Sequence, residues 1–416
     1  MFARFEVQRC SINLRGTGGV SPLIGQWLRL ARPGPRGVIV FDPHTSAQIS
    51  APERLTLSSP DALLAAVPHL LGFPVRNSVV LVGLTTDASG RELIHLTQRF
   101  DRPSVEVLAE SLPLLAKSAA QPMIASGSQS VIIAVFGDEN PVIDGVLPSS
   151  GLVDDLVEAL DDGRMWVKEA LYTDGASRWS YGCENSACCP IEGAPISDGL
   201  RTLVAAEFAG AGAAMAPSRQ ALVDGFAAAP EQVARVAKLL PGHVGSPGGL
   251  EDWRDACISK IAALRSDPAP APNTVAVVLV GLKDIRVRDT ALWELAHDDS
   301  DKANVISALT IALRSAPEGN IAPVATALAI QHWTRGDGAR ANACLDRAVA
   351  DDPNYSLAAM VGTAIGRGLP PSAWTDVIRQ LDRGTCRKPV HAGAAQTPAR
   401  SPVASFGSPP APSLAG

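Results

Sequence analysis

Two continuous apolar runs constrain the fold of this chain more than any other feature. Residues 78–84 (SVVLVGL) and 130–136 (SVIIAVF) have the length of a typical strand and contain no charged side chain. Strands of this kind are buried on both faces, which is typical of a parallel sheet covered by helices. A helical pattern precedes the first run, where Ser59-Pro60-Asp61 supplies a capping serine, an early proline and an acidic first turn. The alternation predicts an α/β domain with a largely parallel sheet.

After residue 212 the strand patterns stop, and helical patterns follow one another up to residue 383. The remaining elements expected before that point are strands over 93–98, 165–172 and 178–181 and helices over 104–120 and 151–160. We therefore divide the chain into a flexible Arg/Gly/Pro-containing extension (1–54), the α/β domain (55–212), an all-α domain of helical hairpins (213–383) and a disordered Pro/Ala/Ser tail (384–416).

One stretch of the helical domain is similar to a tetratricopeptide repeat. Residues 336–354 match mainly the second helix of such a repeat and the turn after it, and residues 309–317 repeat part of the pattern. Small alanines allow helices to approach closely, Leu345 fills the space between them, and Pro353 ends the helix. We expect stacked helical hairpins, whose surface would either bind a protein partner or simply cover a core.

Charge and composition restrict the classes of function. The chain has 416 residues, a net charge of −6 and 46% hydrophobic residues, and no apolar run reaches the length of about 18 that a membrane helix needs. The acidic central part disfavours nucleic-acid binding, although residues 1–54 hold seven arginines against three acids and leave binding through this basic arm as a weaker alternative. Without an apolar secretory signal, and with few cysteines, the protein is expected in the cytoplasm.

Three of the seven cysteines form the best candidate site. Cys183, Cys188 and Cys189 follow two aromatic residues and precede Pro190. Thiolates are zinc ligands, but the spacing differs from the paired Cys-x2-Cys units of zinc ribbons. A metal site, a reversible disulfide and thiols packed under a loop therefore all stay open. Further metal donors would have to come from His69, His95 or His243, and the scattered cysteines Cys10, Cys257, Cys344 and Cys386 are expected to be buried.

Several weaker candidates carry charged side chains. Asp87 and the group Gly137-Asp138-Glu139 follow expected strands, where they would bind a cation, act as bases or simply form turns. Arg99 and Asp101 would form an anion clamp or a plain surface pair. Three further residues are expected in a solvated turn before a helix, namely Arg286, Arg288 and Asp289. His69 lies among apolar residues and is expected at the core or its edge. The common catalytic motifs Gly-x-Ser-x-Gly and His-Glu-x-x-His do not occur.

Three blocks resemble the domain of unknown function family 4192. These blocks are Leu57–Phe73 (LSSPDALLAAVPHLLGF) with the following Asn77-Ser78, the cysteine block Trp179–Gly193, and the stretch Gly336–Tyr355. The resemblance extends over about residues 55–380. It implies a bacterial cytoplasmic protein, and it implies no activity because none is assigned to that family.

These observations lead to one main prediction and one principal alternative. The main prediction is a binding or adaptor protein whose helical domain binds a protein partner. The alternative is a metal- or thiol-dependent enzyme built around Cys183, Cys188 and Cys189, with zinc as the metal that such thiols would hold.

Overall fold

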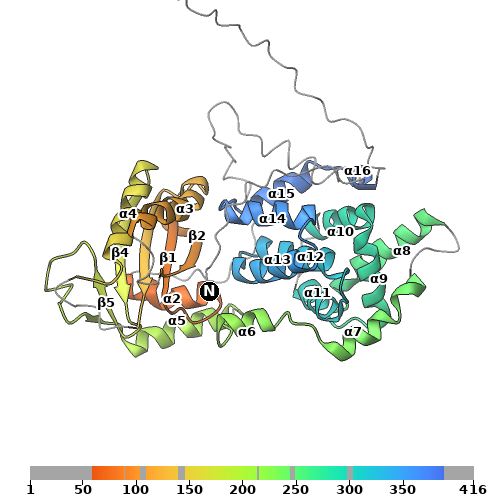
Figure 1. Ribbon diagram of the computed structural model, residues 1–416, viewed down its shortest axis with the longest axis horizontal. Helices are drawn as coiled ribbons and strands as arrows, with labels where there is room; N and C mark the ends of the chain where they lie inside the picture. Colours follow the sequence, from red (N-terminus) through yellow and green to blue (C-terminus); the bar gives the residue numbers. More distant parts are fainter. Residues whose placement is uncertain are drawn as a thin grey trace, which may run out of the picture. The chain divides into compact units, whose positions relative to one another are not determined.

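The computed structural model consists of an α/β region followed by a region made of helices alone (Figure 1). It describes residues 59–88, 90–103, 109–138, 146–212, 215–243, 249–297 and 303–387. All of these residues fall within one compact unit, Ser21–Lys388. The domain boundary between residues 212 and 213 therefore stays a prediction from the sequence.

The sheet of the α/β region has six strands in the order β2-β1-β3-β4-β5-β6. The strands are β1 (Ser78–Thr86), β2 (Glu92–Asp101), β3 (Ser130–Phe136), β4 (Trp166–Thr173), β5 (Ser177–Ser180) and β6 (Ala194–Pro195). Only β3 and β4 pair in parallel, and the other neighbouring strands are antiparallel. The sheet is mixed, so the prediction of a largely parallel sheet was wrong.

A tight turn explains why the strand directions differ from the prediction. The Asp87 amide donates to the Arg91 carbonyl over 2.8 Å, and the Arg91 amide donates back to the Asp87 carboxylate over 3.0 Å. Gly90 supplies the positive φ of +82° in this turn. Strand β2 consequently returns beside β1 as a hairpin, and β1 pairs with β3 on its other side. The apolar runs are buried on both faces because helices cover both faces, whatever the direction of the strands.

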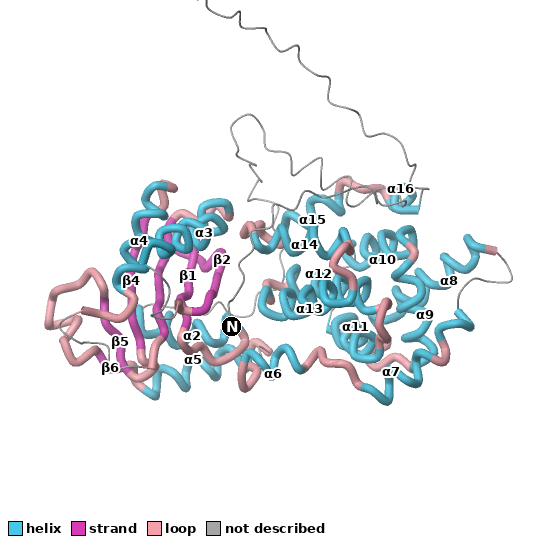
Figure 2. Tube along the Cα trace, in the orientation of Figure 1, coloured by secondary structure: helices cyan, strands magenta, loops and turns pink. Residues whose placement is uncertain are grey.

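Four helices form the layers on either side of this sheet (Figure 2). They are α2 (Pro60–Leu71), α3 (Leu112–Ala125), α4 (Ser150–Asp162) and α5 (Asp198–Gly210). Alternate residues of β3 show the two faces: Ile133 packs with the apolar residues of α3 and α4, and Ile132 packs with those of α2. Helix α5 lies along α2, where Phe208 stacks on His69 with ring centroids 5.0 Å apart.

The helical region begins at α6. Its α-helices are α6 (Arg219–Asp224), α7 (Pro230–Ala237), α8 (Leu250–Ala262), α9 (Pro272–Lys283), α10 (Ile285–His297), α11 (Ala303–Ser315), α12 (Ile321–Thr334), α13 (Gly338–Asp351), α14 (Ser356–Gly366), α15 (Ser372–Arg379) and α16 (Arg383–Arg387). Helix α12 lies at its centre and is buried at every position from Ala322 to Trp333. Helix α13 packs along α12, and its N-cap is Asp337, whose carboxylate accepts the Arg340 amide over 3.0 Å.

The structure agrees with most of the expected elements and differs at their ends. The helix expected within 336–354 is α13, and the run 130–136 is strand β3 over the same residues. Helix α5 and the short strand β6 were missed. The extension 1–54 lies outside the described residues, as does the tail beyond Arg387. Helix α16 begins at the expected boundary residue Arg383 and ends at Arg387, and its Cys386 side chain is fully buried.

None of the helices among the described residues combines the length and the apolar character that crossing a membrane requires.

Candidate metal centre

The three clustered cysteines lie in the loop that connects β5 to β6. Cys183 and Cys189 are half-buried, and Cys188 is exposed. Their Sγ atoms all lie within 4.8 Å of one another, and those of Cys183 and Cys188 are 3.4 Å apart. The fold thus brings together the three thiols that the sequence marked as the best candidate site.

Local hydrogen bonds hold this part of the loop. The Asn185 carbonyl accepts the amide of Cys188 over 3.1 Å and the amide of Cys189 over 2.8 Å. The Ser180 hydroxyl at the end of β5 accepts the amide of Cys183 over 3.2 Å. A turn at Asn185 therefore folds the chain back, so that the adjacent pair Cys188 and Cys189 faces Cys183.

An aromatic side chain fixes the return of the loop toward β6. The Trp179 indole is buried, and its Nε1 donates to the Ile191 carbonyl over 3.0 Å. Gly193 has a φ of +88°, and a Cβ there would lie 2.5 Å from the Trp179 ring. Only glycine fits this backbone conformation against this ring. The second half of the loop is therefore anchored to the sheet independently of the thiols.

Charged groups lie beside the thiols on the sheet side. Arg178 on β5 forms an ion pair with Asp61 on α2, and its Nη1 lies 4.0 Å from the Cys189 Sγ. Burial raises the pKa of the nearby Glu169 carboxyl, and the charge of Arg178 opposes that shift. The Arg178 guanidinium is the only one of these charges that favours a thiolate.

Cys183 and Cys189 differ in acidity. The pKa of Cys183 is lowered, first by a backbone hydrogen bond at Asn185 and then by hydrogen bonds from the other two thiols. The pKa of Cys189 is raised to about 11, first by burial and then by its hydrogen bonds to the neighbouring thiols. Of these two thiols, Cys183 is therefore the one that ionises more readily, which favours it as a ligand or nucleophile.

No histidine among the described residues completes the site. Each of the three candidates has its own partner elsewhere: His69 stacks on Phe208, His95 Nε2 lies 2.9 Å from the Ser126 carbonyl, and His243 Nε2 lies 2.8 Å from the Asn273 amide oxygen. Within the described part of the chain, the group of mutually close ligand atoms contains the three thiols and no carboxylate.

The weaker candidates on the sheet have structural surroundings. Asp87 forms the β1–β2 turn described above. Gly137 lies where a Cβ would come 2.2 Å from the Tyr172 hydroxyl, and Asp138 is exposed. Glu139 lies outside the described residues. Arg99 and Asp101 do form an ion pair on β2.

The prediction of a solvated turn at Arg286, Arg288 and Asp289 was wrong, because all three residues belong to helix α10. Arg288 and Asp289 belong to helix α10 and are buried, with side chains 4% and 0% exposed. Asp284 caps this helix earlier than expected, because its carboxylate accepts the Arg286 amide over 2.9 Å. Sequence reasoning expected a later start, since the apolar pattern becomes regular only after Asp289.

Sequence reasoning missed the residues that surround the thiols. Asp61 and Arg178 are 117 residues apart, and nothing in the sequence connects them. Arg178 lies on the strand that leads into the cysteine loop, and only the packing of α2 against the sheet brings Asp61 beside it.

The comparison with known families covers most of the folded chain. A family model described as "Domain of unknown function (DUF4192)" matches residues 60–372. No curated protein and no solved structure matches the chain. The match includes α2 at one end, the cysteine loop and the helical hairpins up to the start of α15 at the other. Because it covers more than half of the sequence, the chain belongs to the DUF4192 family.

Proposed function

We propose that this chain is a zinc-binding protein in which Cys183, Cys188 and Cys189 hold the ion. The observation that carries the proposal is the convergence of three Sγ atoms within 4.8 Å of one another. Bound zinc is tetrahedral with zinc–sulfur bonds of about 2.3 Å, so that two ligating sulfurs lie about 3.8 Å apart. The 3.4 Å between Cys183 and Cys188 requires only a small adjustment to reach that separation.

The surroundings of the thiols support binding of a cation. Metal binding requires thiolates, and a divalent ion offsets the cost of ionising a thiol such as Cys189, whose pKa is raised to about 11. Three thiolates and one zinc ion leave a single negative charge. The Arg178 guanidinium, 4.0 Å from the Cys189 Sγ, lies where it compensates that charge.

The protein supplies three ligands and leaves the fourth position to an external group. Structural zinc sites are usually closed by four protein ligands, whereas three ligands and an open position are typical of sites that bind water or substrate. Cys188 is exposed, so this position faces solvent. The proposal therefore includes the metal-dependent enzyme that the sequence left as an alternative, with a zinc-bound water as its reactive group.

The metal content of the full chain tests this proposal. Tag-free protein is purified under reducing conditions and its metals are measured by inductively coupled plasma mass spectrometry. We expect about one zinc per chain, lost in Cys188→Ser. Replacement by Co²⁺ gives sulfur-to-cobalt charge-transfer absorption if thiolates are the ligands.

Two control variants separate the site from general effects. Ser186→Ala changes the same loop without touching a thiol and should keep the zinc. Cys257→Ala removes a buried thiol in helix α8, far along the chain from the loop, and should also keep it. Zinc that stays bound in Cys188→Ser, or wild-type protein without metal and with all thiols titratable, would overturn the proposal.

A reversible disulfide between Cys183 and Cys188 is the second candidate function. It is favoured by their 3.4 Å separation and by the lowered pKa of Cys183. The Cys183 thiolate would take one oxygen atom from a hydroperoxide. The rest of the peroxide leaves as water or an alcohol. The resulting sulfenic acid would then condense with the Cys188 thiol and release water. Peroxide treatment of metal-free protein should remove two hydrogens per chain, whereas the double variant Cys188→Ser/Cys189→Ser, which keeps no neighbouring thiol in the cluster, should stop at the sulfenic acid.

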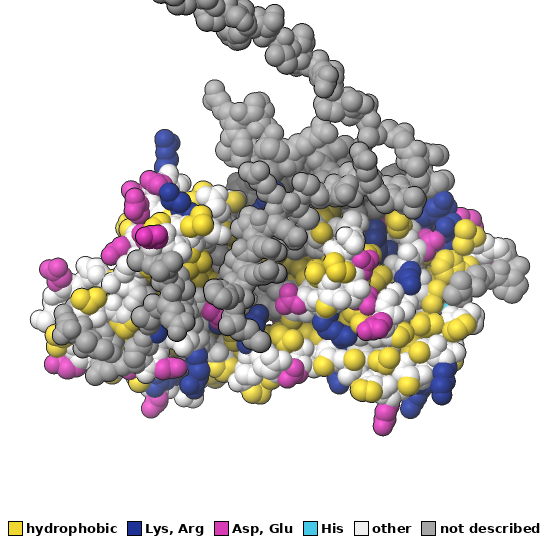
Figure 3. Space-filling model, viewed as in Figure 1, with side chains coloured by type: hydrophobic (Ala, Val, Ile, Leu, Met, Phe, Trp, Pro, Cys, Tyr) yellow, Lys and Arg dark blue, Asp and Glu magenta, His cyan; other side chains and the backbone are white. Residues whose placement is uncertain are grey.

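The adaptor prediction has weaker support from the structure. In the helical region the large apolar side chains that are exposed among the described residues include Leu250 and Val349, on α8 and α13 respectively. Where Figure 3 colours the side chains of the helical region, positive and negative charges lie between apolar side chains. A protein partner for the helical region remains a prediction, tested by affinity capture with the full chain.

A further inference from the structure

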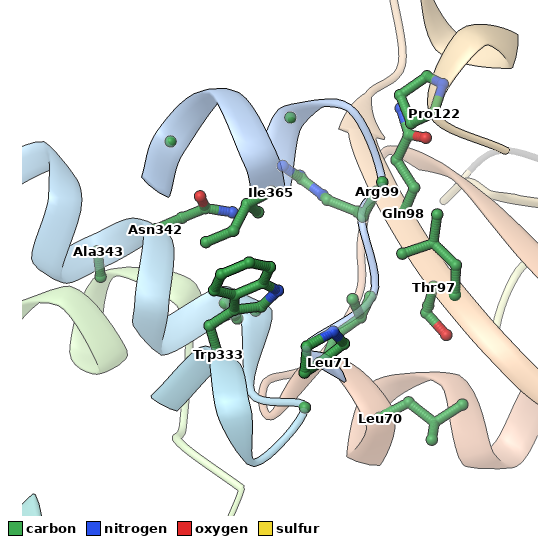
Figure 4. A pocket seen from close by; sticks show the side chains of 18 of the residues that line it. Leu70, Leu71, Thr97, Gln98, Arg99, Pro122, Trp333, Asn342, Ala343 and Ile365 are labelled. Carbon is green, nitrogen blue, oxygen red and sulfur yellow. The ribbon is translucent and has the colours of Figure 1, made fainter. Parts of the chain in front are cut away.

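A cleft between strand β2 and the helical region is large enough for a small molecule. Its volume is about 550 Å³, within the range of about 300–1,000 Å³ that small-molecule sites occupy. Its walls come from the end of α2 and from β2 on one side and from α12, α13 and α14 on the other (Figure 4). These elements are far apart in sequence, and the cleft is separate from the cysteine loop, none of whose residues lines it.

Glycines keep one wall of the cleft open. A Cβ at Gly338 or at Gly366 would meet no atom within 4 Å, so the first turn of α13 and the last turn of α14 expose their backbones there. Gly368 does the opposite. It has a φ of +68°, and a Cβ there would lie 2.4 Å from the Pro122 carbonyl, so that this loop is held tightly against α3. One end of the cleft is therefore closed where Gly368 contacts α3, and its middle is lined by the exposed backbone at Gly338 and Gly366.

Apolar side chains form most of the remaining lining. Trp333 projects from the end of α12 toward the middle of the cleft, with Ile365 above it and Leu71 below (Figure 4). Leu222 closes the side formed by α6 and is buried. An apolar body of a ligand would lose its contact with water against these four side chains, which is the main source of affinity in such sites.

A cation lies on the β2 side of the lining. The Arg99 side chain is 17% exposed, and its Nε donates to the Ser78 hydroxyl over 2.9 Å, which fixes its direction. Its ion-pair partner Asp101 is 80% exposed, and an ion pair with such an exposed carboxylate contributes little free energy. A carboxylate that arrives with its body buried in the cleft would compete well with Asp101 for this guanidinium.

The acidic side chain in the lining lies on α13 and has a different partner. Asp346 is close enough to Arg219 on α6 for that cation to lower its pKa, while loss of water in the cleft raises it more strongly. The lining thus holds two cations, Arg99 and Arg219, and one carboxylate, Asp346, and so carries an excess of positive charge. An anionic group is therefore favoured at Arg99, away from Asp346.

We propose that this cleft binds a small amphipathic carboxylic acid, with its apolar body against Trp333 and its carboxylate on Arg99. The proposal is independent of the metal site and does not require that the protein hold zinc.

Octanoate is a suitable probe, with octanamide as its uncharged counterpart of equal length. Binding to the full chain is measured by isothermal titration calorimetry and by the change in tryptophan fluorescence. We expect octanoate to bind at least about tenfold more tightly than octanamide, since one charged hydrogen-bonded pair is worth about that factor. Arg99→Leu should abolish this preference, and Arg99→Lys should keep part of it.

Two matched glycine variants test the position of the ligand. Gly366→Leu places a side chain in the cleft from the last residue of α14 and should weaken octanoate binding at least about tenfold, because it occupies the space of the ligand. Gly210→Leu makes the same change at the last residue of α5, where a Cβ also meets nothing within 4 Å, and should leave binding unchanged. Both variants keep their helical circular dichroism if they fold.

Three results would overturn the proposal. These are undetectable octanoate binding by the wild type, equal binding of octanoate and octanamide, or equal binding by the Gly366→Leu and Gly210→Leu proteins. The Cys188→Ser protein should bind octanoate like the wild type, so that failure of the metal proposal and failure of this one are distinguished.

Discussion

The buried ion pair of helix α10 allows a sharp test of what stabilises the helical region. Arg288 donates from Nε and Nη2 to one carboxylate oxygen of Asp289, over 2.9 and 2.7 Å, and from Nη1 to the Tyr355 hydroxyl over 3.1 Å. The Arg288 side chain is 4% exposed and that of Asp289 is not exposed at all. Tyr355 directly precedes α14, so the guanidinium connects α10 to a helix that is distant in sequence.

Arg288→Met should lower the free energy of unfolding by about 3–5 kcal/mol, because it removes the guanidinium from a fully buried carboxylate. Tyr355→Phe removes only the hydroxyl that accepts from Arg288 and should cost about 1–3 kcal/mol. The combination of Arg288→Met with Asp289→Leu should be more stable than Arg288→Met alone, since it also removes the buried charge.

The same helix offers a matched control. Arg286 is 25% exposed and pairs over 3.1 Å with Glu251, which is 60% exposed, so Arg286→Met should cost at most about 1 kcal/mol. Urea unfolding of each protein is followed by far-ultraviolet circular dichroism. The unfolding midpoints are compared among variants whose unfolding free energy has the same dependence on urea concentration. If Arg288→Met and Arg286→Met lower stability equally, the buried pair does not anchor α10.

Three further predictions concern the cysteine loop and helix α12. Gly193→Ala should lower the unfolding temperature more than Gly175→Ala, as measured by differential scanning fluorimetry. Both positions have a positive φ, but only a Cβ at Gly193 would meet the Trp179 ring. Burial lowers the pKa of His332 to about 4, below the value of about 6.5 in an unfolded chain. The unfolded state therefore binds more protons in this range, so stability should fall by up to about 3 kcal/mol from pH 6.5 to pH 4, and His332→Phe should remove this slope in urea titrations at each pH. Asp351→Ala should cost about 1–2 kcal/mol by urea unfolding, because its carboxylate accepts the amides of Gly319, Ile321 and Ala322 at the start of α12, and an unchanged midpoint would contradict this role.

Sequence patterns were sufficient to predict an element or a site wherever the interactions that form it are local. The β3 run, the cap at Ser59 and helix α13 could each be recognised from neighbouring residues, and each is present in the structure. The cysteine cluster belongs to the same class. Its thiols lie within seven positions of one another, and the turn at Asn185 that joins them uses hydrogen bonds between residues at most four apart.

Tertiary structure decided the features that depend on distant segments. A buried apolar run has the same composition in parallel and antiparallel sheets, so the direction of β1 and β2 followed from the turn at Asp87 rather than from the runs themselves. The burial of Arg288 depends on Tyr355, which lies 67 residues away. The cleft at Trp333 likewise exists only because α12 and β2 face each other. Short-range patterns record the conformational preference of each segment, whereas burial and ligand sites arise from contacts whose partners the sequence does not specify.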